Sequence, residues 1–121
     1  MFLPLAHTKL DVYKCSKEFV LSCYKLTREL PDSERFILTQ QIRRAALSVH
    51  LNLAEGSSRK SNNERKRYYE IARGSIIEID AAFDICDGLN YLTIEIMQPT
   101  GDLMVRTFRM LSKMIEKYDR E

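Results

Sequence analysis

The sequence predicts an all-α protein, an antiparallel up-down-up-down bundle of four helices. Apolar residues recur at three- and four-residue steps along four separate stretches, and short polar or proline-containing segments separate these stretches. Only 4 Gly and 3 Pro leave little room for a turn-rich β fold. With 121 residues, the chain is long enough to form one domain with its own core. We expect this single domain to span residues 1–121, with helices at about 8–30, 34–56, 62–90 and 100–119.

The first helix is expected to begin at Thr8-Lys9-Leu10-Asp11, which has the form of a capping box. In such a box, side-chain oxygen atoms accept hydrogen bonds from the free N–H groups of the first turn. Pro31-Asp32 should end this helix, because proline cannot continue it. Its inner face carries a single apolar stripe: Val12, Cys15, Phe19, Cys23, Leu26 and Leu30.

The second helix is expected to have apolar residues on two opposite faces and Gly56 as its C-cap. The inner face carries Leu38, Ile42, Ala45, Ala46, Val49 and Leu53. The outer face is apolar at several positions but is interrupted by Gln40, Arg43 and Arg44. A helix with two apolar faces is normally buried on both sides, so we expect the outer face to contact another subunit. The predicted interface residues are Phe36, Ile37, Gln40, Leu47 and Leu51.

A polar linker at residues 57–63 precedes the third helix, which a second capping box, Ser61-Asn62-Asn63-Glu64, should open. Gly74 inside this helix is unfavourable by about 1 kcal/mol relative to Ala, which predicts a close contact that needs a missing side chain. Pro99 predicts a turn or kink before the main fourth helix from about Thr100. The inner residues of these two helices are Tyr69, Ala72, Ile76, Ile79, Phe83, Cys86, Met104, Phe108, Leu111, Ile115 and Tyr118.

The net charge of +2 is unevenly distributed along the chain. Residues 34–73 contain nine Lys or Arg and only four Asp or Glu. Part of this cluster surrounds a helix start, where backbone N–H groups also favour anions, and Tyr68 and Tyr69 could stack on bases. We predict nucleic-acid contacts by Arg43, Arg44, Arg59, Lys60, Arg65, Lys66 and Arg67. Two other interpretations remain open: a solvated linker that keeps the protein soluble, and pairing of Arg43 and Arg44 with acids of another subunit.

Asp80, Asp84 and Asp87 lie at helical spacing, where carboxylates can bind a metal or act as an acid–base pair. Metal sites in helical bundles normally add a Glu-x-x-His motif, which this sequence lacks. The three aspartates are therefore interpreted as a solvated acidic flank or as the partner of a basic surface on a neighbouring subunit. We expect no catalytic site, no metal and no cofactor.

Two polar residues of the second helix should have structural partners. Glu55 lies near the predicted helix end, where its charge opposes the helix dipole, so we expect a specific partner such as an arginine. Asn52 could specify helix register through a buried hydrogen bond. The two histidines, His7 and His50, occur in unrelated sequence contexts.

The three cysteines occupy apolar helix positions without metal-ligand spacing, so we interpret them as reduced core residues. The first ten residues lack a basic segment followed by a long apolar run, and no apolar run is long enough to span a membrane. We therefore expect a cytoplasmic protein with no membrane partner.

Residues 33–75 also carry a recognisable pattern, which extends to Glu78. It comprises Leu38-Thr39-x-Gln41-Ile42-x-Arg44-Ala45, Ser48-Val49, Asn52-Leu53-Ala54-Glu55-Gly56, Arg59, Tyr69-x-x-x-Arg73-Gly74-Ser75 and Glu78. The chain thereby resembles the four-helix-bundle proteins encoded in intervening sequences of bacterial 23S ribosomal RNA genes. The accessory variability determinant proteins of diversity-generating retroelements, which work beside a reverse transcriptase, are similar to that family.

The resemblance implies a bundle that assembles into a barrel-shaped homopentamer, with a reverse transcriptase or another protein as a possible partner. It implies no enzymatic activity, and the retroelement proteins, unlike this chain, are strongly basic. The resulting hypothesis is a non-catalytic homo-oligomeric bundle that binds RNA or DNA through a basic surface as an accessory or scaffold protein. The alternative is a protein–protein adaptor with no nucleic-acid role.

Overall fold

The computed structural model describes residues 1–119, which contain four α-helices. They are α1 (Asp11–Thr27), α2 (Leu38–Ser58), α3 (Asn62–Gly88) and α4 (Ile94–Asp119). Two short 3-10 helices, η1 (Ala6–Lys9) and η2 (Asp32–Glu34), precede α1 and α2. No strand occurs in this described part of the chain. The predicted all-α class with four helices is therefore confirmed.

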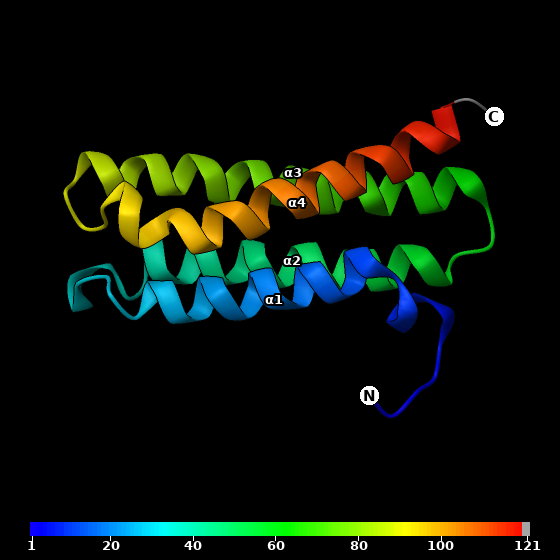
Figure 1. Cartoon of the computed structure of the whole chain (residues 1–121), viewed down its shortest axis with the longest axis horizontal. Coiled ribbons are helices and arrows are strands. Elements are labelled where there is room, and N and C mark those ends of the chain that lie inside the picture. Colours follow the sequence, from blue (N-terminus) through cyan, green and yellow to red (C-terminus); the bar gives the residue numbers. More distant parts are fainter. Residues whose placement is uncertain (120–121) are drawn as a thin grey trace.

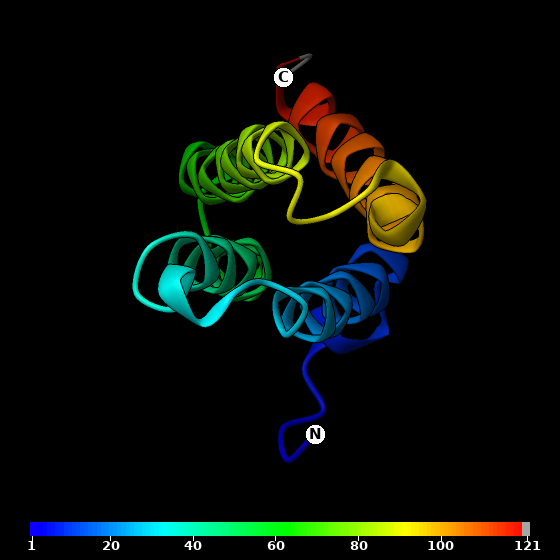
Figure 2. The same cartoon turned by 90° about the vertical axis from the view of Figure 1, so that its left-hand side faces the viewer.

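The four helices lie side by side, and the chain reverses its direction at each connection (Figure 1). α1 and α3 each pack against α2 and α4, so that the helices surround one core, as the end-on view shows (Figure 2). The most extensive helix contact joins α2 and α3. We call one end of the bundle the loop end, because the α2–α3 connection lies there beside the start of α1 and the end of α4 (Figure 1).

The core contains the residues that the apolar periodicity predicted. Every predicted inner residue of the first and third helices is buried. In the other two helices only Leu38, Phe108 and Tyr118 are half-buried rather than buried. All three cysteines are free and buried, and burial raises the pKa of Cys23 to about 12, so this thiol remains protonated. Within residues 1–119, no helix combines the length and the apolar character needed to cross a membrane.

The first helix is shorter than the predicted span of about 8–30. The Thr8 hydroxyl donates to Leu5 O at 2.7 Å inside η1, so it does not cap α1, which begins at Asp11 without a side-chain cap. At the other end, Leu30 N donates to Thr27 O, which closes a turn rather than continuing the α-helical ladder. The predicted capping box at Thr8 is therefore wrong, whereas Ser61 does cap α3 by accepting from Glu64 N at 3.1 Å.

The second helix lies four residues later than predicted at its start and extends past Gly56. Ile37 has φ −120° and ψ −92°, which is not helical, so α2 begins only at Leu38. Gly56 is buried inside α2 and is not a C-cap. A Cβ atom at this position would lie 2.8 Å from Tyr68 Cβ and 3.0 Å from Tyr69 Cε1. Glycine is thus needed at residue 56 because α3 passes there in close contact.

The close contact predicted at Gly74 is wrong, since nothing lies within 4 Å of a Cβ atom built there. The predicted start of the fourth helix at Thr100 is also wrong, because α4 begins at Ile94 and contains Pro99. Proline removes one N–H donor near the start of α4, while Met97 and Thr100 on either side are already buried in the core. This packing keeps the segment helical despite the missing hydrogen bond.

A pair of glycine substitutions tests this difference between residues 56 and 74. We expect Gly56→Ala to lower the free energy of unfolding by about 1–3 kcal/mol, because the new methyl group overlaps Tyr68 Cβ. Gly74→Ala should raise it by up to about 1 kcal/mol, because alanine favours helix and meets no neighbour. Urea unfolding at equal protein concentration measures both changes. A Gly56→Ala variant as stable as the parent would contradict the packing described here.

Candidate nucleic-acid interface

The fold divides the charge of the chain between the two ends of the bundle. The half of the bundle at the loop end comprises residues 1–18, 50–73 and 107–119 (Figure 1). These residues include twelve Lys or Arg and seven Asp or Glu, a net charge of +5. Residues 19–49 and 74–106 form the other half, with six Lys or Arg against nine Asp or Glu, a net charge of −3. The loop end is therefore the basic end of a polar molecule.

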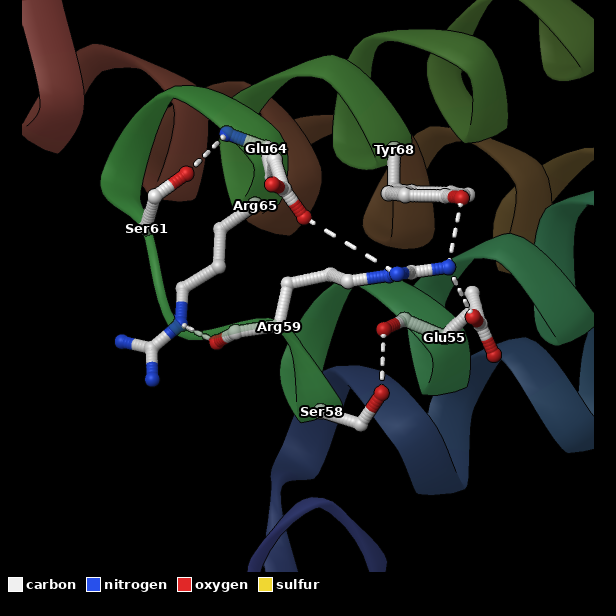
Figure 3. Close-up of polar contacts among 7 residues, drawn as sticks. All are labelled: Glu55, Ser58, Arg59, Ser61, Glu64, Arg65 and Tyr68. Carbon is white, nitrogen blue, oxygen red and sulfur yellow. Dashed lines mark hydrogen bonds and ion pairs between the residues drawn. The ribbon is translucent and has the colours of Figure 1, made fainter.

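Arg59 closes the connection between α2 and α3 (Figure 3). Its Nη2 lies 2.5 Å from Glu55 Oε1 and 2.8 Å from the Tyr68 hydroxyl, and its guanidinium also lies over the Tyr68 ring. Glu64 adds a longer ion pair of 3.9 Å. The arginine partner predicted for Glu55 is thus confirmed. Because Arg59 binds groups of both helices, its role is to hold the turn closed.

Arg65 and Lys66 also have partners within the chain. Arg65 Nε donates to Arg59 O at 2.6 Å and so binds a carbonyl group at the end of α2. The other two guanidinium nitrogen atoms of Arg65 point away from the neighbouring residues (Figure 3). Lys66 forms an ion pair with Asp119 at the end of α4. These contacts leave only the outer part of Arg65 for a ligand.

Lys60 and Arg67 are exposed, and neither has an ion pair within 4 Å among residues 1–119. Further exposed cations lie at the same end of the bundle but outside residues 34–73, so the local charge count in the sequence did not include them. They come from the start of α1 and the end of α4, far from the linker in sequence: Lys9, Lys14, Lys113 and Lys117. The exposed charge of the loop end is therefore larger than the linker alone indicates.

Arg43 and Arg44 lie elsewhere on the molecule. Arg43 Nε donates to Thr27 Oγ1 at 2.9 Å, and its guanidinium lies 4.9 Å from the centre of the Tyr24 ring, so it joins α2 to α1. Arg44 is exposed on the outward surface of α2. The side-chain amide of Gln40, oriented by its neighbours, accepts from Arg44 Nη2 at 3.1 Å. The structure therefore separates these two arginines from the linker cations.

Of the other predicted interface residues, Gln40, Leu47 and Leu51 lie with Arg44 on this outward surface, whereas Phe36 and Ile37 precede the helix. Phe36 is 77% exposed, Ile37 66%, Leu51 59% and Leu47 39%. Gln40 is half-buried. Within residues 1–119 the outer apolar side chains of α2 are thus left uncovered, and their role as a subunit interface stays a prediction.

Polar residues of the sequence pattern join α2 to α3. Ser75 Oγ donates to Ser48 Oγ at 2.8 Å, and Gln41 Nε2 donates to Glu78 Oε2 at 3.2 Å. Asn52 Nδ2 donates to Ser48 O and to Ser48 Oγ. Both of these Asn52 bonds lie within α2, and Ser48 carries the direct contact with α3, so a register role for Asn52 itself stays a prediction.

Two other polar clusters of residues 1–119 contain groups of a kind that can carry chemistry, the three aspartates of α3 and the Ser16–His50 pair. No group of three His, Cys, Asp or Glu residues within residues 1–119 could hold a metal ion, the three aspartates of α3 included. Ser16 Oγ lies 2.7 Å from His50 Nδ1, as in a nucleophile–base pair, but Ser16 is fully buried and its hydroxyl already donates to Tyr13 O. It therefore accepts a hydrogen bond from His50.

The two histidines are nearer than their sequence contexts indicate. Tyr13 contacts both rings, with its centroid 5.1 Å from that of His7 and 4.4 Å from that of His50. The fold brings the two histidines to the same side chain because η1 packs against both α1 and α2.

These features define a four-helix bundle with one basic end, organised around a tightly packed α2–α3 hairpin. The family model of the 23S rRNA-intervening sequence protein matches residues 8–113, so the chain belongs to that family. This confirms the resemblance to the intervening-sequence proteins. The relation to the retroelement proteins stays a prediction.

The fold is also similar to that of a crystal structure of a protein with unknown function from the S23 ribosomal protein family of Bacteroides thetaiotaomicron VPI-5482. The two chains are 21% identical, and the likeness covers 86% of this chain and 97% of the other with a TM-score of 0.79. At this identity the likeness concerns the fold alone. No curated protein matches the sequence.

The His50 contacts predict a pH dependence of stability. Burial, with a smaller contribution from Lys17 and His7, lowers the pKa of His50 below its ordinary value of 6.5. The unfolded chain then binds more protons than the folded chain just below pH 6.5. We expect the free energy of unfolding to be highest above this pH and to fall as the pH drops through 6.5 towards the lowered pKa.

Urea unfolding between pH 5 and pH 8 measures this dependence, and His50→Gln is the comparison, because glutamine can donate a hydrogen bond but does not titrate in this range. The slope between the folded and unfolded pKa values should be smaller in the variant. An unchanged slope would show that His50 does not contribute to it.

Proposed function

We propose that this protein is a non-catalytic accessory or scaffold protein, an antiparallel four-helix bundle that forms a homo-oligomer and binds nucleic acid at its basic end. The observation that carries the proposal is the net charge of +5 in the half of the bundle at the loop end, where Lys60 and Arg67 are exposed. Within residues 1–119 these two cations have no ion pair that a phosphate would have to displace. Phosphate groups are the ligands that such a surface attracts most strongly in a nucleic acid.

The contacts of the two tyrosines favour phosphate binding over base stacking. Tyr69 is only 3% exposed and hydrogen bonds to Ser57, and the Arg59 guanidinium lies over the Tyr68 ring. Neither ring is free to serve as a stacking platform for single-stranded bases. The proposed ligand is therefore a duplex or a structured RNA, which presents phosphates at regular spacing.

Not all of the seven residues that the sequence predicted as nucleic-acid contacts are proposed as phosphate contacts. Lys60, Arg67 and the outward part of Arg65 (Figure 3) are the contacts from the linker region. Lys113 and Lys117, at the same end of the bundle, are added from α4, where they lie towards the start of α1. Arg43, Arg59 and Lys66 are assigned to the bundle itself, because each has a partner within the chain. Arg44 is assigned to the outward surface of α2.

Assembly increases the affinity that this surface can provide. One copy offers few phosphate contacts, whereas an oligomer repeats the basic end and multiplies the counterions released on binding. The uncovered apolar surface of α2 supports assembly, and the family resemblance implies five copies. That surface also favours a second candidate, a protein–protein adaptor that covers it with a different partner, such as a reverse transcriptase.

Fluorescence anisotropy with a structured RNA and a duplex DNA tests nucleic-acid binding across salt concentrations. We expect affinity to fall steeply as salt rises. In the variant Lys60→Ala/Arg67→Ala, the slope of log affinity against log salt on duplex DNA should decrease by about 0.9 for each phosphate contact removed.

The matched control is Lys25→Ala/Arg28→Ala, which removes two exposed positive charges from the opposite half of the bundle. This control should bind like the parent protein. Absence of binding at low salt, or equal weakening by both double variants, would contradict the proposed surface. The adaptor would then be the better hypothesis.

A further inference from the structure

An acidic groove with an apolar floor runs between α3 and α4. It consists of two adjacent hollows that share Asp80, Met104 and Val105. Further apolar groups in these hollows include Phe83 and Met97. The acidic groups at the groove are Asp80, Asp84, Asp87 and Asp102. Among residues 1–119, none of these four has an ion pair within 4 Å. Arg109 lines the same hollow as Asp80 and brings a positive charge to the groove, against four carboxylates.

The outward surface of α2 has the complementary character. Gln40, Arg44, Leu47 and Leu51 recur at three- and four-residue steps and form a ridge opposite the buried face of α2. Leu47 and Leu51 are its exposed apolar side chains, and Arg44 is its positive charge. We call these four residues the α2 ridge.

We propose that the α2 ridge of one copy docks into the α3–α4 groove of the next copy, with Arg44 against Asp80 and Asp84. This inference rests on the proposed homo-oligomer and states which surfaces form it. Apolar side chains of the ridge meet the apolar floor, and the arginine meets carboxylates that lack a partner in the described chain. A second copy is the occupant because the positively charged, partly apolar ridge complements the acidic, partly apolar groove and overlaps it in height along the bundle.

The two surfaces are equally long. The ridge extends over eleven residue steps from Gln40 to Leu51, and the groove extends over eleven steps of α3 from Ile76 to Asp87. At 1.5 Å per residue, both measure about 17 Å. Ridge and groove therefore have the same length.

The two surfaces also overlap in height along the bundle: residues 40–47 of the ridge lie at the heights of residues 83–76 in the groove, while Leu51 lies at the height of residue 72, just beyond it. The hydrogen bond between Ser48 and Ser75 shows that these two residues lie at the same position along the bundle axis. Because α3 runs in the opposite direction to α2 (Figure 1), each residue before Ser48 is level with a residue after Ser75. Arg44, four residues before Ser48, therefore lies at the height of residue 79, next to Asp80 in the groove. Leu47 lies in the same way at the height of Ile76 and Ile77, which line the apolar part of the groove.

If neighbouring copies are related by a rotation about an axis parallel to the helices, each residue keeps its position along the direction of that axis. Neighbouring copies related by such a rotation would bring Arg44 to Asp80 and Leu47 to Ile77 without any sliding. Because ridge and groove are different surfaces, the contact is head-to-tail and can close into a ring. All copies then point the same way, so every loop end contributes its positive charge to one face of the ring.

Charge reversal tests the pairing in the full chain by sedimentation velocity over a concentration series. We expect Arg44→Asp to weaken self-association by at least about tenfold, and Asp80→Arg/Asp84→Arg to do the same, because like charges then meet across the contact. The combined variant Arg44→Asp/Asp80→Arg/Asp84→Arg should recover most of the parent association. Circular dichroism checks that each variant keeps its helices.

Arg67→Asp is the matched control, since it reverses an exposed arginine outside ridge and groove. It should leave self-association unchanged while weakening RNA binding. A parent protein that stays monomeric at all concentrations would overturn both the homo-oligomer and the docking. An assembled parent that tolerates Asp80→Arg/Asp84→Arg, or a combined variant without recovery, would overturn the docking alone.

Discussion

The close approach of α3 to Gly56 is the constraint on which the rest of the structure depends. Tyr68 and Tyr69 occupy the space that a side chain at residue 56 would need, so α2 and α3 can approach each other closely near the turn. Arg59 then closes the turn through groups of both helices, and Ser48 meets Ser75 farther along. The α2–α3 hairpin fixed in this way gathers the linker cations at one end and sets the relative heights of the α2 ridge and the α3–α4 groove.

Local periodicity predicted the helices and the core well, because a stripe of apolar residues needs no knowledge of the neighbouring helix. The failures concern features that only tertiary contacts decide. Gly56 was predicted to be a C-cap and Gly74 to mark a close contact, but of these two glycines it is Gly56 that lies against another helix. Pro99 predicted a break, and the burial of Met97 and Thr100 in the core offsets the one hydrogen bond that proline removes.

The candidate site was only partly predictable for a related reason. The sequence shows where positive charge is concentrated but not which cations are already bound, so Arg59 and Lys66 were included although the bundle uses them. Conversely, Lys113 and Lys117 were not predicted as contacts, because they lie about fifty residues beyond the linker in the sequence. A signal for them was present: in an up-down bundle, the end of the fourth helix lies beside the connection between the second and third helices.

The sequence pattern and the proposed ligand contacts concern different residues, and this explains why family membership leaves the function open. Hydrogen bonds join α2 to α3 through four residues of the pattern, Gln41, Ser48, Ser75 and Glu78. Three others, Glu55, Gly56 and Arg59, lie at the turn between the two helices. The pattern therefore specifies a hairpin and not a reaction or a ligand. Lys60 and Arg67 lie outside it, on the surface. The charge of the loop end can consequently change without disturbing the hairpin, so what this bundle binds must be decided from the surface residues of the individual chain.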